Sequence, residues 1–200
     1  MKYTKLVKAE TTKKYKLLKD ISTFMDGEKV YRIQALVSFA DVTAGDLGGF
    51  ISKEENLTQD GNAWVYDKAF ASGNARVSED AKVYGKARVS GNAKVSENAK
   101  VYGRADVSDN AEVCGDAKVH GDAFVQDNAK VFGKANVYED AVVSGKAVVA
   151  DRAKVCGHAL VTGNAKVSGN ATVYEVMNVS GDVELYNNDD VENYIKNSAN

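Results

Sequence analysis

Alanine recurs at every sixth residue from Ala63 to Ala171 without interruption, and this repeat constrains the fold more than any other feature. A valine stands two places after each of these alanines except Ala69, where Ala71 takes the place of the valine. In a strand, residues two apart point to the same face, so each A-x-V triplet predicts a very short strand with Ala and Val inward and x outward. An α-helix would place successive apolar pairs about 240° apart and would form no apolar face.

Three turn residues separate successive triplets, in combinations such as S-G-N, S-E-D and Y-G-K. Gly and Asn tolerate the positive φ of a sharp corner, and Asn or Asp can also bond its own local backbone. Three strands and three corners make a triangular coil of 18 residues, and such coils stack at the strand spacing of roughly 4.8 Å. Residues 18 apart then lie above one another, which predicts one corner column of aromatic side chains. Its members are Tyr66, Tyr84, Tyr102, Tyr138 and Tyr174, with His120 and Cys156 in its two gaps.

The hexads also resemble the repeats of a known protein superfamily. Repeats such as V-S-G-N-A-K resemble those of the hexapeptide-repeat, left-handed parallel β-helix superfamily, and the handedness follows from this resemblance. The segment AGDLGGFISKEENLTQDGNAWVYDKA, residues 44 to 69, is similar more specifically to a group of bacterial and prophage proteins with an A-x-V hexad. We therefore predict an all-β fold, a left-handed parallel β-helix of about seven to eight coils over residues 45–186.

The two ends of such a solenoid expose strand edges that need covers. Residues 1–44 are predicted to form a small N-terminal cap with a strand at 30–39. Residues 187–200 are predicted to form a C-terminal capping helix, with Asp189 or Asp190 as its cap. Its inward side chains are expected to be Val191, Tyr194 and Ile195.

Charge and cysteine content indicate which partners and which cellular compartment the chain is expected to have. A net charge of −2 gives no general bias toward nucleic acid or membranes, and no segment approaches the roughly 18 apolar residues of a membrane helix. The two cysteines, Cys114 and Cys156, lack CxxC spacing, and the polar N-terminus is no signal peptide, so we expect a cytoplasmic protein with reduced thiols. No cofactor is expected. A metal site is not expected either, since Cys156 and His158 would lack a third ligand.

Basic and aromatic residues gather on adjacent coils around the tyrosine corner. Aromatic planes beside cations suit a small planar anion such as a nucleotide, through stacking and charge-assisted hydrogen bonds. In the alternative interpretation, the aromatic column stiffens a corner and the lysines only solubilise the surface. The candidate ligand-binding residues are Lys82, Tyr84, Lys86, Arg88, Lys100, Tyr102, Arg104, Lys118 and His120.

The resemblance also implies a possible enzyme class, because many hexapeptide-repeat proteins are acyl-CoA-dependent acyltransferases. Those enzymes generally use a histidine base, often near a loop that interrupts the repeat. Here the candidates are His120 and His158, both in corner positions, and no loop interrupts hexads 63 to 173. We therefore expect exposed corner histidines rather than catalytic ones, with an acyltransferase as the alternative.

Three consecutive outward positions on one face are apolar: Phe124, Val142 and Leu160. A contiguous exposed apolar ladder usually marks an interface, and the superfamily resemblance implies a homotrimer. Cover by a terminal segment of the same chain is the alternative. Together these features predict a non-enzymatic oligomeric scaffold. The resemblance to prophage proteins implies a phage accessory role, and we expect such a protein to sequester a small anionic host signal. A purely structural or protein-binding solenoid is a third possibility.

Overall fold

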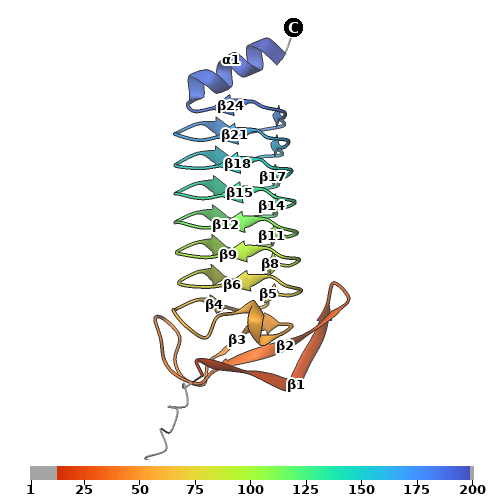
Figure 1. The fold of residues 1–200 in the computed structure, drawn as a ribbon, viewed down its shortest axis with the longest axis vertical. Coiled ribbons are helices and arrows are strands. Elements are labelled where there is room, and N and C mark those ends of the chain that lie inside the picture. Colours follow the sequence, from red (N-terminus) through yellow and green to blue (C-terminus); the bar gives the residue numbers. More distant parts are fainter. Residues whose placement is uncertain (1–12, 199–200) are drawn as a thin grey trace, which may run out of the picture.

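The computed structural model describes residues 13–198, most of which form a left-handed parallel β-helix of triangular coils (Figure 1). The predicted fold class is confirmed, including a short helix at the C-terminal end. Within residues 13–198, the strands form one sheet of ten and two sheets of seven. Each coil strand pairs in parallel with the strand 18 residues away, as Val101 does with Val119. Among the described residues, no helix has the length and hydrophobicity that crossing a bilayer requires.

Each side of the prism is named after one outward residue. The Lys100 face consists of β4 (Trp64–Val65), β7 (Lys82–Val83), β10 (Lys100–Val101), β13 (Lys118–Val119), β16 (Asn136–Val137), β19 (Lys154–Val155) and β22 (Thr172–Val173). The Phe124 face consists of β5 (Phe70–Ala71), β8 (Arg88–Val89), β11 (Asp106–Val107), β14 (Phe124–Val125), β17 (Val142–Val143), β20 (Leu160–Val161) and β23 (Asn178–Val179). The Lys130 face consists of β6 (Arg76–Val77), β9 (Lys94–Val95), β12 (Glu112–Val113), β15 (Lys130–Val131), β18 (Val148–Val149), β21 (Lys166–Val167) and β24 (Glu184–Leu185).

The interior contains the repeat's alanines and valines. Every alanine from Ala63 to Ala171 at the hexad position is completely buried, and so is each valine that follows it. The backbone connects the coils through hydrogen bonds such as Lys100 N to Ala117 O at 2.9 Å and Tyr102 N to Val119 O at 3.0 Å. Each coil therefore depends on its neighbours above and below, as in other solenoids.

The corners correct one detail of the prediction. The left-handed backbone positions are taken by glycine, as expected, but elsewhere by Asp or Glu rather than by Asn, with φ of 60° at Glu139 and 59° at Asp127. The acidic side chain reaches the backbone of the next coil, since Gly157 N donates to Glu139 Oε2 at 2.6 Å and Gly145 N to Asp127 Oδ2 at 2.9 Å. This bond offsets the cost of a non-glycine residue at positive φ. The corner asparagines instead bond one another between coils: Asn74, Asn92, Asn110 and Asn128 form an amide ladder.

An antiparallel hairpin covers the N-terminal end of the solenoid (Figure 1). It consists of β1 (Tyr15–Met25) and β2 (Glu28–Ala35), joined by Asp26 and Gly27 at φ of 50° and 80°. Positive φ at both central residues is the conformation that suits a two-residue hairpin turn. Next, β3 (Leu47–Ile51) pairs antiparallel with β2 and parallel with β5, and a 3-10 helix, η1 (Glu54–Asn56), follows. Thus β3 carries the chain from the hairpin into the first coil.

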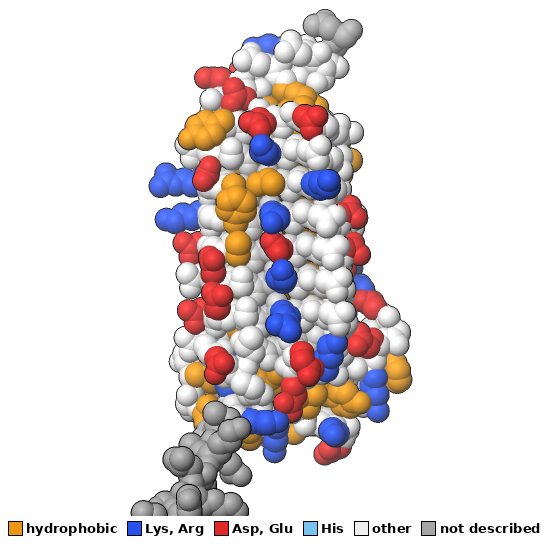
Figure 2. Space-filling view, viewed as in Figure 1, with side chains coloured by type: hydrophobic (Ala, Val, Ile, Leu, Met, Phe, Trp, Pro, Cys, Tyr) orange, Lys and Arg blue, Asp and Glu red, His pale blue; other side chains and the backbone are white. Residues whose placement is uncertain are grey.

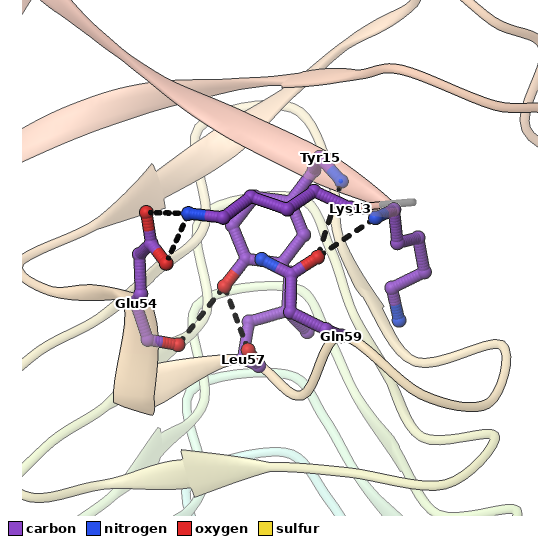
Figure 3. A network of polar contacts seen from close by, with 6 residues as sticks. Lys13, Tyr15, Glu54, Leu57 and Gln59 are labelled. Carbon is purple, nitrogen blue, oxygen red and sulfur yellow. Dashed lines mark hydrogen bonds and ion pairs between the residues drawn. The ribbon is translucent and has the colours of Figure 1, made fainter. Parts of the chain in front are cut away.

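A polar network attaches the start of β1 to the first coil (Figure 3). The Tyr15 hydroxyl lies 2.9 Å from Glu54 O and 2.7 Å from Leu57 O. Lys14 is buried, and its ammonium donates to the carbonyls of Gly61 and Ala63 at 3.2 and 3.0 Å. These contacts satisfy carbonyls that the open end of the solenoid would otherwise leave without partners. Burial also lowers the pKa of Lys14 to about 8, although nearby Asp60 and Asp80 act in the opposite direction.

This lowered pKa predicts a rise in stability with alkaline pH. Between pH 8 and 10.5 the unfolded chain keeps the Lys14 proton that the folded chain has lost, so the free energy of unfolding increases with pH. We expect a rise of about 1 to 2 kcal/mol between pH 7.5 and 9.5. Above pH 10 it reverses, because burial raises the pKa of Tyr15 in the folded chain.

Urea denaturation of the wild type and Lys14→Met across this range measures the effect. The variant is expected to lose the rise while keeping every other titrating group. A wild type and a variant with parallel pH profiles would contradict the prediction.

The C-terminal cover is α1 (Asn188–Ser198). Its N-cap is Asn187, whose Oδ1 accepts from Asp190 N at 3.0 Å, while Asp190 Oδ2 accepts from Asn187 N at 3.1 Å. The prediction of Asp189 or Asp190 as the cap was therefore wrong, since Asp190 is the reciprocal partner three residues on. Val191 is buried as predicted, and Tyr194 bonds Asn178 O at 2.8 Å. Ile195 stays exposed, contrary to prediction, because Tyr194 takes the contact with the last coil.

Candidate ligand-binding site at the tyrosine column

The aromatic column predicted from the 18-residue period follows the corner after the Lys100 face. The rings of Tyr84 and Tyr102 are stacked 4.7 Å apart and nearly parallel, and His120 lies 4.5 Å beyond Tyr102. Tyr138 continues the stack 5.3 Å from His120. Burial raises the pKa of both Tyr84 and Tyr102, so their hydroxyls stay neutral and able to donate near pH 7.

The stack breaks at its lower end. The ring of Tyr66 lies 6.4 Å from that of Tyr84 and at 87° to it. The Tyr66 hydroxyl donates to Asp41 Oδ1 at 2.9 Å, and Lys82 Nζ lies 2.7 Å from the same oxygen. The bond from Lys82 lowers the pKa of Asp41, which stays ionised. Because Asp41 belongs to the loop between β2 and β3, the cap itself holds Tyr66 out of the stack.

Two adjoining pockets lie at this break. The first has a volume of about 280 Å³ and is lined by Asp41, Tyr66, Asp67, Lys82, Tyr84 and Lys100. The second, of about 440 Å³, shares Lys82 and Lys100 and reaches along the Lys100 face to Lys118. Their combined size is typical of small-molecule sites, and they bring an aromatic surface next to a row of lysines.

The lysines of these pockets differ from those on the Lys130 face. There, Glu112 pairs with both Lys94 and Lys130, at 3.0 and 3.1 Å. Figure 2 shows this face, with basic and acidic side chains interspersed along the solenoid. By contrast, no carboxylate within residues 13–198 lies within ion-pair distance of Lys100 or Lys118. These two lysines are therefore available to an external anion.

The acidic residues around the pockets are mostly engaged already. Asp41 holds Lys82 and Tyr66, as described above. Asp67 Oδ2 accepts from Gly85 N at 3.0 Å, and Asp80 Oδ1 accepts from the Asn62 amide at 2.7 Å. Asp116 also lines the second pocket, so the two pockets together contain four carboxylates and three lysines. Of the three lysines, Lys82 is paired with Asp41, whereas Lys100 and Lys118 have no ion-pair partner within residues 13–198.

The structure does not bring all nine candidate residues together. Lys82, Tyr84 and Lys100 line the first pocket, and Lys118 lines the second, whereas Tyr102 and His120 lie within the stack. Lys86 and Arg88 lie across the corner, and Arg104 pairs with Asp122 at 3.0 Å. The candidate residues fall into separate groups because they lie on two sides of a triangular prism, and outward side chains on two such sides point away from each other. Asp41, Tyr66 and Asp67 line the site but were not among the candidates.

The two histidines have different surroundings. His120 lies between two aromatic rings, with Nε2 3.1 Å from Asn136 Oδ1, and burial lowers its pKa. His158 is exposed, and its Nδ1 lies 3.5 Å from Asp140 Oδ2. An imidazole oriented by a carboxylate is a feature of many catalytic bases. Of the two, His158 has the more accessible ring. Within the described residues, no group of three His, Cys, Asp or Glu could hold a metal ion.

The apolar ladder of the Phe124 face is only partly accessible. Phe124 is 44% exposed, whereas Val142 and Leu160 are half-buried between their neighbours. Their strands, β14, β17 and β20, are consecutive in the sheet, so the three side chains form one continuous strip.

Comparison with known proteins gives one informative match. The chain is 38% identical over 78 residues to YdcK of Escherichia coli (strain K12), which is described as an uncharacterized acetyltransferase. The aligned segment covers 35% of this chain and 24% of that protein. Fold and match together support the hexapeptide-repeat β-helix superfamily. No protein-family model matches the chain.

Proposed function

We propose that this hexapeptide-repeat solenoid is a non-enzymatic binding scaffold that holds a small planar anion, such as a nucleotide, where its aromatic column breaks. The observation that carries the proposal is the rotation of Tyr66 out of the stack by Asp41, beside lysines that lack carboxylate partners. A planar ring would lie against Tyr84 and the edge of Tyr66, and its anionic group would bind Lys100 or Lys118. Sequestration of a nucleotide-like host signal by a phage accessory protein is the role that we infer for it.

Calorimetric titration tests this proposal. Adenosine and guanosine monophosphates and triphosphates and a cyclic dinucleotide are titrated into the full chain at low and at physiological salt. At least one is expected to bind, more weakly at higher salt. Lys100→Gln and Tyr84→Leu should each lower the affinity about tenfold, the equivalent of one charge-assisted contact or one stacked ring.

Lys130→Gln provides the matched control. It removes an outward lysine from a face where Glu112 already neutralises that position, so the affinity should not change. Absence of saturable binding by every nucleotide, or equal losses in Lys100→Gln and Lys130→Gln, would contradict the proposal.

Acyl transfer from acetyl-CoA is a second candidate function. It is favoured by the match to the uncharacterized acetyltransferase and by the accessible His158 beside Asp140. It predicts thermal stabilisation by coenzyme A and release of its thiol from acetyl-CoA with an amine acceptor. His158→Ala should abolish that release while leaving nucleotide binding at Tyr84 intact.

We also propose that the chain self-associates through the strip of Phe124, Val142 and Leu160, with a homotrimer favoured. The exposure of Phe124 supports this, because a large aromatic side chain on a flat strand surface favours burial. Sedimentation of the wild type and of Phe124→Glu tests it, since the charged variant should be monomeric. A monomeric wild type would exclude the interface.

A further inference from the structure

The tip of the β1–β2 hairpin is attached to the side of the solenoid. Figure 1 shows it rising beside the lowest coils, on the side of β5 and β8. Asp26 forms an ion pair with Arg88, and Glu28 Oε2 accepts a hydrogen bond from Gly73 N at 2.7 Å. These two attachments join the turn to two successive coils and fix the position of the tip.

A cleft of about 430 Å³ lies between the tip and the coils. Its lining residues are Phe24, Met25, Asp26, Lys68, Phe70, Lys86 and Arg88. Phe70 is buried, and the Arg88 guanidinium lies over its ring, 5.6 Å from the centroid. On the opposite wall, Phe24 is 69% exposed, the highest exposure of any described phenylalanine. The cleft therefore has an apolar wall supplied by the hairpin, and Figure 2 shows the tip as a protrusion bearing hydrophobic and charged side chains.

The other wall of the cleft has two stacked cations. Lys68 and Lys86 are 18 residues apart and so occupy the same corner column on successive coils. Higher in that column the charge is compensated, because Arg104 pairs with Asp122 at 3.0 Å. No carboxylate in residues 13–198 lies within ion-pair distance of Lys68 or Lys86, and the one acid lining the cleft, Asp26, is engaged by Arg88. Two like charges one coil apart repel, and an anion between them would relieve that repulsion.

We propose that this hairpin-tip cleft binds an anionic amphiphile. A carboxylate or phosphate group lies between the ammonium groups of Lys68 and Lys86, and the attached apolar chain lies against Phe24 and Met25. The cleft is separate from the pockets at the tyrosine column, because Lys86 and Lys100 lie on different sides of the shared corner. Apolar contact and charge are both required, which distinguishes this ligand from a free phosphate and from an uncharged lipid.

Calorimetry with octanoate and octyl phosphate tests the proposal on the full chain. At least one of the two is expected to bind, and their relative affinities distinguish a carboxylate site from a phosphate site. Octanol, acetate and inorganic phosphate each lack one of the two features and should bind at least tenfold more weakly. Lys86→Gln and Phe24→Ser should each weaken the amphiphile at least tenfold, and both replace exposed side chains whose loss leaves the core intact.

Lys134→Gln is the matched control for Lys86→Gln. Lys134 ends the turn F-G-K just as Lys86 ends the turn Y-G-K, but it lies at another corner. Its replacement should leave octanoate binding unchanged, and so should Lys100→Gln, which affects the tyrosine-column site. Absence of saturable binding, equal binding of octanol, or displacement of octanoate by a nucleotide would overturn the proposal.

Discussion

Replacing Trp64 with alanine is expected to lower the free energy of unfolding by about 4 kcal/mol, the usual cost of removing a buried tryptophan side chain. Trp64 occupies the outward position of its hexad on β4, where the repeat alone would leave it exposed. Instead it is only 1% exposed, with the rings of Tyr15 and Phe39 meeting it edge-on at 6.0 and 5.4 Å. Its removal would empty the junction between the cap and the first coil, and would expose the solenoid end to association between chains.

Urea denaturation and sedimentation at several concentrations measure both effects. Trp64→Phe retains an aromatic ring at the junction and should lose much less stability. Phe132→Ala removes an aromatic side chain from a corner position that is 37% exposed, away from the proposed interface, and should change stability by less than about 1 kcal/mol. A Trp64→Ala protein as stable as Phe132→Ala would show that the cap contributes little.

The repeat predicted the coils almost completely because each hexad meets an identical environment. One rule, Ala and Val inward, fixes the strand positions, the parallel register and the vertical columns together. The stack of Tyr84, Tyr102 and His120 followed from spacing alone, without knowledge of any contact. Such reasoning works wherever the local sequence and its neighbours 18 residues away supply all the contacts of a residue.

The break in the column could not be predicted in this way. It depends on Asp41, which lies before the regular hexads and has no periodic relation to Tyr66 or Lys82. A contact between a cap loop and a corner depends on how the hairpin docks, which no repeat encodes. For the same reason, Arg88 was grouped with the tyrosine corner, whereas Asp26 of the hairpin tip binds it on the Phe124 face. Tyr66 could have been included in the site, since the period already placed it in the column.

The GDLGG segment, residues 45 to 49, belongs to the stretch on which the resemblance to bacterial and prophage proteins rests, and the hexad repeat assigns it no role. In the structure, Gly48 and Gly49 lie in β3 at the point where the cap meets the first coil. A Cβ on Gly49 would lie 2.4 Å from Ala69 O and 2.7 Å from Val65 Cγ1. Two glycines here are thus required by the close approach of two backbones.

Gly49→Ala is accordingly expected to lower the free energy of unfolding by about 3 kcal/mol, at the upper end of the cost of overpacking, because a carbonyl oxygen cannot move aside as a side chain can. For a chain of this size that corresponds to a fall in Tm of roughly 6 to 12 °C. Thermal unfolding measures it directly.

Gly45→Ala separates steric conflict from backbone strain. Gly45 has a φ of +97° but open space around its Cβ position, so alanine there meets strain without a clash. Gly49 has no positive φ, so alanine there meets a clash without that strain. A loss of only about 1 kcal/mol is expected for Gly45→Ala. If the two variants unfold at the same temperature, close packing of β3 on the first coil does not explain the paired glycines, and the joint between cap and solenoid must be looser than its geometry indicates.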